Sequence, residues 1–435
     1  MIFRLCLGAL LLCVGHIASA RPLLEHQASA AALPPAVLAI PHSAFHDWPS
    51  VHRQAASVVE QWRAEPPTLA WTRIQLDLFV KHKMMPTRGA RGLALLHVAM
   101  HDAQALALAR GQDSRLALSM AAAQVLGYLF AAEERAFDRL GFAIAAKLSG
   151  QALGELNDAD RQAMLLGYQV GRTVVQYAEQ DGAQRGWNGL RLQYYGEQRY
   201  YGPGAWEPTP PYFYYPPDEP FAPGWTPWML TSNAEFRPVP PAYGSPRYLQ
   251  DLKEVQEVSR SLSPAQLEIA KFWVDGHGSV TPPGHWNQIA LEEVKRAGLG
   301  AAATARLFAQ LNVALADTFL AVWDCKYHYW TARPVTVAAP LTGQPLKPAL
   351  LTPPFPSYVS GHAAFSGAAA RVLARAFPAR AAHLDALAEQ AAISRLFAGI
   401  HFRHDNEDGL KLGRQVADKI LSSPIWESQG AVRQP

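Results

Sequence analysis

Apolar residues return every three or four positions along most of the chain, and this spacing predicts amphipathic helices. It is clearest from Ser57 to Glu179, a stretch rich in the helix formers Ala, Leu, Gln and Arg. The pattern returns near Pro246, breaks at Thr281–Gly284 and continues through Trp323. After that point we expect short loops and three further helices.

The helical spacing is lost between about residues 186 and 241, where Tyr, Trp and Pro crowd together, as in Tyr212–Pro217. Proline has no backbone N–H and does not continue a helix. Aromatic side chains are costly to leave in water, so we expect an ordered loop that packs over the helices and shapes one wall of a cleft. A disordered Pro-rich tract is the alternative, although such tracts are usually poor in aromatics.

Strand-like alternation is scarce and no repeat of fixed period is present, so the predicted fold class is all-α: a helical bundle with one long Pro- and aromatic-rich loop. Three parts are expected, namely a signal peptide over 1–20, an N-terminal helical region over 21–300 and a C-terminal helical region over 301–425. The two helical regions are expected to form one compact unit.

The first twenty residues have the three parts of a secretion signal: Arg4, the apolar run Leu5–Val14 and the small residues Ala18–Ala20. We therefore expect an exported protein, periplasmic or secreted, whose mature chain starts near Arg21. Only Cys325 remains after such cleavage, so no internal disulfide is expected.

The chain has 435 residues, of which 49% are hydrophobic, and a formal net charge of +3. This composition supports a large buried core, and the small positive excess gives no support for a nucleic-acid or membrane-surface partner. The longest later apolar stretch, Ala301–Trp323, is interrupted by Arg306 and Asp317, so we expect a buried core helix and no stable membrane span. The expected partners are small molecules, and the sequence does not specify an oligomeric state.

Three short segments of the last third carry the candidate chemistry, and the first runs from Lys326 to Pro334. Seven residues separate Lys326 from Arg333, so two helical turns would place both cations on one face, while Pro334 moves Arg333 toward the following loop. Lysine offers a compact charge, and arginine offers a planar fork that matches two oxygens of a tetrahedral oxyanion.

The second segment is Phe355–His362, which is followed by Ala-rich helical sequence. Ser360 is expected to cap the helix, and Gly361 to let an anion approach the backbone N–H groups of the helix start, which favour negative charge. His362 then lies beside that anion, where an imidazole gives or takes a proton near neutral pH.

The third segment runs from Ser394 to Asp405. Arg395 adds a third cation, and His401 offers a nitrogen that attacks phosphorus or ligates a metal, with Asp405 one turn later to fix its tautomer. Arg395 and His401 do not share a helix face at this spacing, so we expect a break at Gly399 that turns both toward one point.

Each segment alone is more often structural than catalytic, but their order and spacing resemble the signature shared by vanadium-dependent haloperoxidases and type 2 phosphatidic acid phosphatases. The resemblance runs from Ala314 to Arg414 and is most specific to bacterial vanadium-haloperoxidase-like proteins, as in Trp323–Lys326, Thr352–Pro356 and Gly399–Arg403. It implies the helical-bundle fold of that family.

The resemblance also implies a role for each residue. His401 would be the axial ligand of vanadium, and His362 would act as acid and base where hydrogen peroxide binds, so that a halide attacks the activated peroxide and leaves as hypohalous acid. Vanadium would stay oxidised throughout, and no haem would be needed. The oxygens of the vanadate would be held by Lys326, Arg333, Arg395, Ser360 and the Gly361 N–H.

The same positions suit an exported soluble acid phosphatase, because vanadate resembles the transition state of phosphoryl transfer. His401 would then form a phosphohistidine, His362 would protonate the leaving alcohol, and no cofactor would be needed. Binding of phosphate or vanadate without turnover is a third possibility, although it would not require His362. The residues at these positions do not separate the two chemistries.

Neighbouring aromatics favour the haloperoxidase. Trp323 and Phe355 resemble the lining of its substrate pocket near the peroxide site, and Phe at position 355 is similar to the chloroperoxidase pattern, although ordinary aromatic packing explains both equally well. Two positions depart from the family: Val359 stands where Pro is usual, and His404 replaces a commoner aromatic.

Other histidines offer weaker sites. His97 and His101 are one helical turn apart with Asp102 beside them, a spacing that suits zinc, but no third ligand is evident, so a packed pair is the ordinary explanation. His328 and His404 would tune the oxyanion site or else stand exposed on loops.

Overall fold

The computed structural model describes residues 23–24, 49–150, 156–184 and 201–426. Within these residues the regular structure is helical and no strand is present, so the prediction of an all-α fold is confirmed. The expected signal peptide over 1–20 lies outside the described residues, as does the part of the Pro- and aromatic-rich loop before Tyr201.

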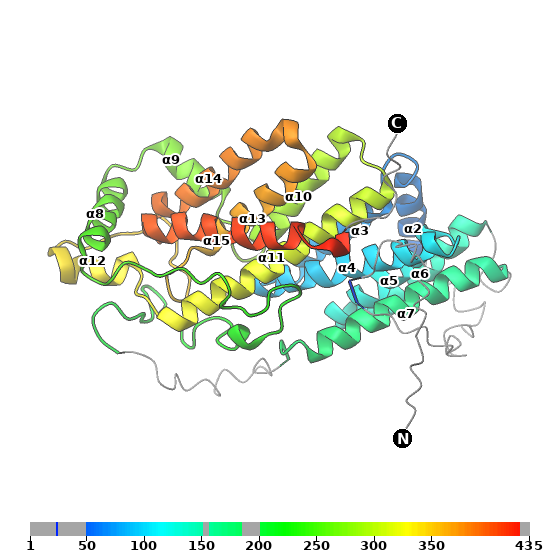
Figure 1. The fold of residues 1–435 in the computed structure, drawn as a ribbon, viewed down its shortest axis with the longest axis horizontal. Helices are drawn as coiled ribbons and strands as arrows, with labels where there is room; N and C mark the ends of the chain where they lie inside the picture. Colours follow the sequence, from blue (N-terminus) through cyan, green and yellow to red (C-terminus); the bar gives the residue numbers. More distant parts are fainter. Residues whose placement is uncertain (1–22, 25–48, 151–155, 185–200, 427–435) are drawn as a thin grey trace, which may run out of the picture.

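The first group of helices forms one end of an elongated molecule (Figure 1). Its members are α2 (Pro49–Gln61), α3 (Pro67–Lys81), α4 (Pro86–Ala109), α5 (Ser114–Leu129), α6 (Glu134–Ser149) and α7 (Asp158–Gln180). α5 packs against α4, α6 and α7, which makes it the centre of this group.

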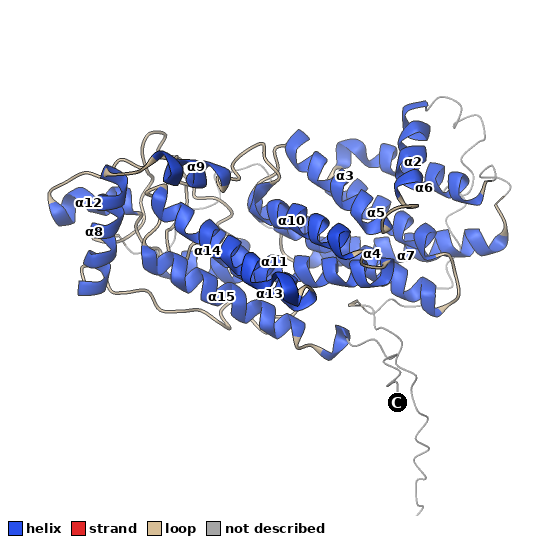
Figure 2. Cartoon of the chain, turned by 90° about the horizontal axis from the view of Figure 1, so that it is seen from above, coloured by secondary structure: helices blue, strands red, loops and turns tan. Residues whose placement is uncertain are grey.

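The second group forms the middle and the other end of the molecule (Figure 2). Its members are α8 (Pro246–Arg260), α9 (Pro264–Phe272), α10 (Thr281–Ala297), α11 (Ala301–Tyr329), α12 (Pro334–Thr342), α13 (Gly361–Ala376), α14 (Ala381–Phe397) and α15 (Arg403–Leu421). α13 packs against α11, α14 and α15, and α11 also contacts α4. The long helix α11 therefore joins the two groups.

Prolines mark the starts of helices in the second group. α8 begins at Pro246, as expected, because the fixed φ of proline suits the first turn and its missing N–H is not needed there. α10 begins at Thr281 with Pro282 and Pro283 in its first turn, so the predicted break at Thr281–Gly284 is wrong and these residues start a helix. The last third has four helices after α11 instead of three, because α12 forms around an internal proline.

Two helices, α4 and α11, are long and apolar enough to cross a membrane by length and composition, but both are largely buried inside the protein. In α11, for example, Phe308, Leu315 and Val322 are fully buried. This burial is that of a core helix, in line with the prediction for Ala301–Trp323.

Asp317 ties the Pro- and aromatic-rich loop to the middle of α11. Its carboxylate is fully buried and accepts hydrogen bonds from the backbone N–H groups of Trp228 (2.7 Å), Met229 (2.8 Å) and Leu230 (3.0 Å). A charged residue that interrupts the apolar run of this helix is therefore an anchor for a segment almost ninety residues earlier in the chain.

The loop packs over the helices only in part. Trp206 and Trp225 are buried, and Trp225 packs edge-on against Phe319 of α11 with ring centroids 5.6 Å apart. The run Tyr212–Tyr215 is instead 49–62% exposed, so the expectation that its aromatics pack is wrong for this run. Prolines flank the run at both ends and donate no backbone N–H that would tie it to the helices.

Replacing Asp317 by Ala is expected to destabilise the protein by roughly 3 kcal/mol, because three backbone N–H groups lose a buried acceptor. Urea denaturation of the variant and the wild type measures this difference in unfolding free energy. His328→Ala, at an exposed position of the same helix, is the control. A loss below about 1 kcal/mol for Asp317→Ala would show that the loop does not depend on this anchor.

Candidate active site

Arg333 is a fully buried arginine just before α12, and its side chain reaches the third segment. Its Nε donates to the Phe355 carbonyl (2.9 Å), and its Nη1 donates to the Ile400 carbonyl (2.9 Å) and to His401 Nε2 (3.0 Å). Burial lowers the pKa of Arg333 to about 9, although the charge of Asp405 opposes the shift, so the guanidinium stays charged at neutral pH. The guanidinium N–H can only donate, so His401 Nε2, which faces it, must be the unprotonated nitrogen that carries the lone pair.

Lys326 is fully buried in the last turn of α11. Its ammonium donates to the backbone carbonyls of Pro356 (2.8 Å), Ser357 (2.7 Å) and Val359 (2.7 Å). Burial lowers the pKa of Lys326 well below its ordinary value, and the charge of Arg333 adds to the shift, but three acceptors match the three protons of an ammonium. Lys326 thus holds the second segment in place and brings positive charge beside it.

Lys326 and Arg333 lie close together, but the backbone between them is not the continuous helix that was predicted. α11 ends before Trp330, which adopts a left-handed conformation (φ 54°), so the two cations do not share a helix face. Arg333 is extended (φ −82°, ψ 154°), as expected for a residue that precedes proline. Both charges still lie over the Phe355 ring, with Lys326 Nζ 5.1 Å and Arg333 Cζ 5.0 Å from its centroid.

The start of α13 is built by Ser360, Gly361 and His362. The Ser360 side chain accepts a hydrogen bond from the Ala363 N–H (3.4 Å), which is the predicted helix cap. A Cβ added at Gly361 would meet nothing nearer than Val322 Cγ1 at 3.9 Å. The helix start therefore leaves room for a group to approach the backbone where negative charge is favoured.

Arg395 and His362 meet at the backbone of Trp273, in the loop after α9. Arg395 Nη1 donates to the Trp273 carbonyl (2.8 Å), and the His362 ring contacts the backbone of Trp273 and Val274. Burial lowers the pKa of Arg395 to about 10, so it stays charged at neutral pH. Burial also lowers the pKa of His362 well below its ordinary value, and Arg395 and His401 add to the shift, so the His362 ring is neutral.

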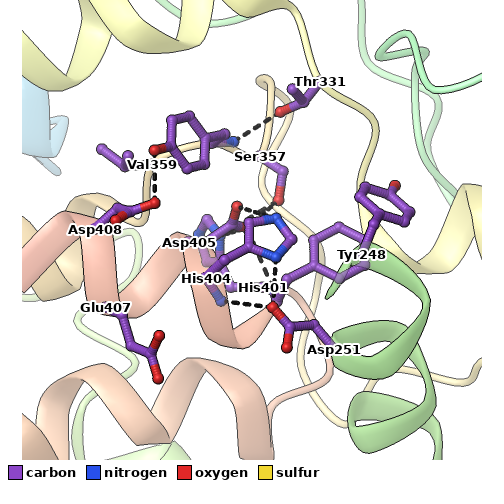
Figure 3. A network of polar contacts seen from close by, with 12 residues as sticks. Tyr248, Asp251, Thr331, Ser357, Val359, His401, His404, Asp405, Glu407 and Asp408 are labelled. Atoms are coloured by element: carbon purple, nitrogen blue, oxygen red, sulfur yellow. Dashed lines mark hydrogen bonds and ion pairs between the residues drawn. The ribbon is translucent and has the colours of Figure 1, made fainter. Parts of the chain in front are cut away.

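His401 precedes α15 and is held by Asp405 in the first turn of that helix (Figure 3). Its Nδ1 lies 2.8 Å from Asp405 Oδ2, and Ser357 Oγ donates to the same oxygen at 2.5 Å. Burial would raise the pKa of Asp405, but the hydrogen bond from His401 and the other donors outweigh it and hold that pKa well below its usual range. Burial, together with Arg333, lowers the pKa of His401, so the ring is neutral with its proton on Nδ1.

Gly399 turns the chain between Arg395 and His401, as predicted. α14 ends just before this turn, and Gly399 has a φ of 74°, a left-handed conformation that favours glycine. A Cβ at this position would also lie only 3.2 Å from Pro348 Cα. After the turn His401 contacts Arg333 directly, and Arg395 is near enough for its charge to help lower the pKa of Arg333, after burial.

Ser357 is a site residue that the sequence pattern does not single out. Its hydroxyl donates to Asp405 and its carbonyl accepts from Lys326, so it joins the second segment, to which it belongs, to the other two. The only signal in the sequence is its place inside the second segment, three residues before Ser360. A serine at that place has no motif of its own, because its partner lies 48 residues later in the chain.

Three buried nitrogen atoms of these side chains have no hydrogen-bond partner among the described residues: Arg333 Nη2, Arg395 Nε and His362 Nε2. Each belongs to a different segment, and buried polar atoms are almost always paired. Two of them are N–H donors of charged guanidinium groups, so the fitting partner is a negatively charged acceptor. Together with the N–H groups at the start of α13, this donor set fits a small tetrahedral oxyanion such as vanadate or phosphate.

The accessible side of the site is formed by Phe355, Gly361 and His362, which are partly exposed, whereas the cations and His401 are buried. Trp323 is buried and packs against Phe355 with ring centroids 5.1 Å apart. Its Nε1 donates to the carbonyl of Asp218 in the Pro- and aromatic-rich loop (3.1 Å). Of the two predicted pocket residues, Phe355 is therefore partly exposed to solvent, and the buried Trp323 packs against it.

The histidine pair on α4 is packed in the core. His97 is fully buried and stacks on Phe308 with ring centroids 5.2 Å apart, and burial lowers the pKa of His97 to about 4. His101 contacts Asp102 (2.9 Å). Within the part of the chain that the structure describes, no group of three or more His, Cys, Asp or Glu side chains is placed to hold a metal ion.

His404 is not exposed on a loop, so that one of its two predicted alternatives is wrong. It lies in α15, is buried, and its Nδ1 contacts Asp251 Oδ2 of α8 at 2.7 Å. The packing of α8 over this turn explains the difference, because the sequence gives no sign of a partner 153 residues away. His328 is exposed, but it lies in the last turn of α11.

Binding of vanadate or phosphate is expected to be accompanied by proton uptake at neutral pH. The neutral His362 has a low pKa in the free protein, and an anion beside its Nε2 raises that pKa, so the ring takes up at most about one proton. Isothermal titration calorimetry in buffers with different ionisation enthalpies measures the uptake. His362→Gln should show less uptake than the wild type, and equal uptake in both proteins would assign the proton to another group.

The C-terminal region is similar in sequence to known protein families. The family model described as the VCPO second helical-bundle domain matches residues 306–383 and 378–424. Vanadium chloroperoxidase of Curvularia inaequalis is 31% identical over a segment that covers 28% of this chain and 24% of that protein. The matched part therefore spans about a quarter of the length of this relative.

Solved structures of bacterial enzymes are similar over most of the chain. A bacterial vanadium-dependent iodoperoxidase has a TM-score of 0.68 and 27% identity, over 81% of this chain and 94% of that one. An apo-type bacterial vanadium-dependent chloroperoxidase, at 14% identity and a TM-score of 0.62, covers 78% of this chain and 93% of its own, and shows the fold alone. These findings confirm the predicted resemblance to vanadium haloperoxidases and the helical-bundle fold.

Proposed function

We propose that this protein is a vanadate-dependent haloperoxidase-like enzyme that oxidises a halide with hydrogen peroxide. The observation that carries the proposal is the set of three unpartnered buried nitrogens on Arg333, Arg395 and His362, which fits a tetrahedral oxyanion. The relatives named above are vanadium haloperoxidases, and this supports vanadate as the anion.

Two kinds of contact would hold vanadate: a lone pair that ligates the metal and positive charges that neutralise its oxygens. The lone pair on His401 Nε2 would ligate vanadium, and the guanidinium groups of Arg333 and Arg395 would neutralise the charge of its oxygens. Lys326 would add positive charge from its place on the second segment. Bound vanadate supplies a Lewis-acid centre that activates hydrogen peroxide without changing its own oxidation state.

His362 would move the proton that the reaction requires. Its neutral ring has a buried Nε2 without a partner, placed to accept a proton from hydrogen peroxide and to return it to the leaving water. Because His362 and Phe355 lie on the accessible side, peroxide and halide would approach from there. The anion-binding cations are thus buried, and the acid–base residue His362 is partly exposed while its Nε2 is buried against them.

Export is part of the proposal. The apolar run Leu5–Val14 and the small residues Ala18–Ala20 support a cleaved signal peptide and a periplasmic or secreted enzyme. Amino-terminal sequencing of the protein recovered outside the cytoplasm of an expressing bacterium is expected to start near Arg21, and an intact Met1 would contradict export by this route.

The test compares two activities of the purified protein, with and without orthovanadate. Oxidation of iodide, bromide and chloride by hydrogen peroxide is measured by halogenation of a phenol indicator, and hydrolysis of p-nitrophenyl phosphate is measured in parallel. Vanadate-dependent halide oxidation is expected. Phosphate release that vanadate inhibits, without halide oxidation, would establish the phosphatase instead, and anion binding without either activity would establish a binding protein.

A further inference from the structure

A third imidazole, His404, lies between two buried carboxylates next to the proposed site (Figure 3). Its Nδ1 contacts Asp251 Oδ2 at 2.7 Å, and its backbone N–H donates to the same oxygen at 3.1 Å. On its other side, His404 Nε2 lies 3.5 Å from Asp405 Oδ1. One ring therefore connects α8 to the carboxylate that holds His401.

The two oxygens of the Asp405 carboxylate differ in the number of hydrogen bonds that they accept. Its Oδ2 accepts from His401 Nδ1 (2.8 Å), Ser357 Oγ (2.5 Å) and the Phe402 N–H (3.2 Å), whereas its buried Oδ1 has no hydrogen-bond partner among the described residues. The separation of 3.5 Å from His404 Nε2 is a few tenths of an ångström longer than a hydrogen bond. The charge interaction with His404 nevertheless contributes to the lowered pKa of Asp405, after the hydrogen bond from His401, so His404 attracts this carboxylate and opposes its rotation away from His401.

The position of the His404 ring is fixed by its surroundings. It stacks on Phe402 with ring centroids 5.0 Å apart and an interplanar angle of 11°, and Tyr248 and Tyr358 lie 5.8 and 6.1 Å away. Burial would raise the pKa of Asp251, but hydrogen bonds from His404 and Arg247 outweigh it and lower that pKa, so Asp251 is charged. A charged acceptor and an aromatic stack together leave the ring one orientation.

We propose that His404, held by Asp251, is a positioning residue for the His401–Asp405 pair. It orients the Asp405 carboxylate so that the proton of His401 stays on Nδ1. Nε2 then keeps the lone pair that accepts from Arg333 Nη1 in the free protein and would be turned to the oxyanion on binding. This inference rests on the oxyanion site of the proposed function and is independent of whether halide oxidation or phosphoryl transfer takes place there.

The experiment replaces the His404 imidazole by an aromatic ring that has no nitrogen. His404→Phe preserves the stack on Phe402, His404→Gln restores a polar group, and His97→Phe makes the same change at a buried, stacked histidine in α4. Orthovanadate affinity is measured by calorimetry, and the ring ¹⁵N signals of His401 are measured by NMR with labelled histidine. The His401 signals are assigned by their absence in His401→Ala.

His404→Phe is expected to bind orthovanadate about tenfold more weakly and to shift the His401 ring signals toward a mixture of tautomers. His404→Gln should recover part of the affinity, and His97→Phe should match the wild type. A folded His404→Phe with unchanged affinity and unchanged His401 signals overturns the positioning role. If His404→Phe does not fold, Asp251→Asn is judged by the same two measurements.

Failure of the proposed function gives a different result. Wild-type protein that binds neither orthovanadate nor orthophosphate overturns the oxyanion site itself, whatever the variants do. Wild-type protein that binds either anion, together with a His404→Phe variant that binds it equally well, overturns only the role of His404.

Discussion

Replacement of His401 by Ala is expected to reduce vanadate-dependent halide oxidation by about a thousandfold or more, and to weaken orthovanadate binding by at least about a hundredfold. The variant loses the Nε2 lone pair that faces Arg333, and with it the proposed bond to vanadium. The fold should persist, because Asp405 Oδ2 keeps its bonds to Ser357 and to the Phe402 N–H. The measurements are kcat/KM for bromide oxidation and the Kd for orthovanadate.

Two controls separate loss of the ligand from general damage. His328→Ala removes an exposed histidine in the last turn of α11 and should leave both quantities unchanged. Free imidazole added to His401→Ala is expected to restore part of the affinity, because the deleted ring leaves space of its own size. A His401→Ala variant within about tenfold of wild-type activity would remove His401 from the proposed mechanism.

The local parts of the site could be predicted from the sequence, because each depends on residues a few positions apart. Ser360 as a helix cap and Gly399 as a turn follow from short-range backbone preferences. The pairing of His401 with Asp405 follows from a separation of four residues. The resemblance predicts that the three segments lie together, and in the structure Arg333 of the first segment bonds to the backbone of the second and to His401 of the third.

The long-range partners could not be predicted, because contacts between distant helices leave no periodic trace in the chain. Arg395 bonds to a carbonyl 122 residues earlier, and His404 is buried by Asp251 of α8, 153 residues earlier. The common helix face expected for Lys326 and Arg333 failed for a local reason, since the left-handed Trp330 ends the helix between them. Helix α12 was missed because it is nine residues long and contains an internal proline.

Replacement of Gly413 by Ala is expected to destabilise the protein by at least about 3 kcal/mol or to prevent folding. α13 and α15 approach so closely that a Cβ at Gly413 would lie 1.9 Å from the Ala364 carbonyl oxygen. Gly409 repeats the contact one turn earlier, where a Cβ would lie 2.7 Å from the Ser360 carbonyl oxygen. Because the obstructing atoms are backbone, the helices must separate by more than an ångström to admit a methyl group.

The same separation would open the site, since the Ser360 N–H donates to the Asp405 carbonyl at 2.9 Å and links the starts of α13 and α15. Urea denaturation measures the loss of unfolding free energy, and orthovanadate affinity of any folded fraction is expected to fall with it. Gly224→Ala makes the same change at a position where, among the described residues other than its chain neighbours, no atom would lie within 4 Å of the added Cβ, and it should leave both quantities near the wild type. A Gly413→Ala variant within about 1 kcal/mol of wild type would mean that the two helices adjust freely, and that their close approach does not set the geometry of the site.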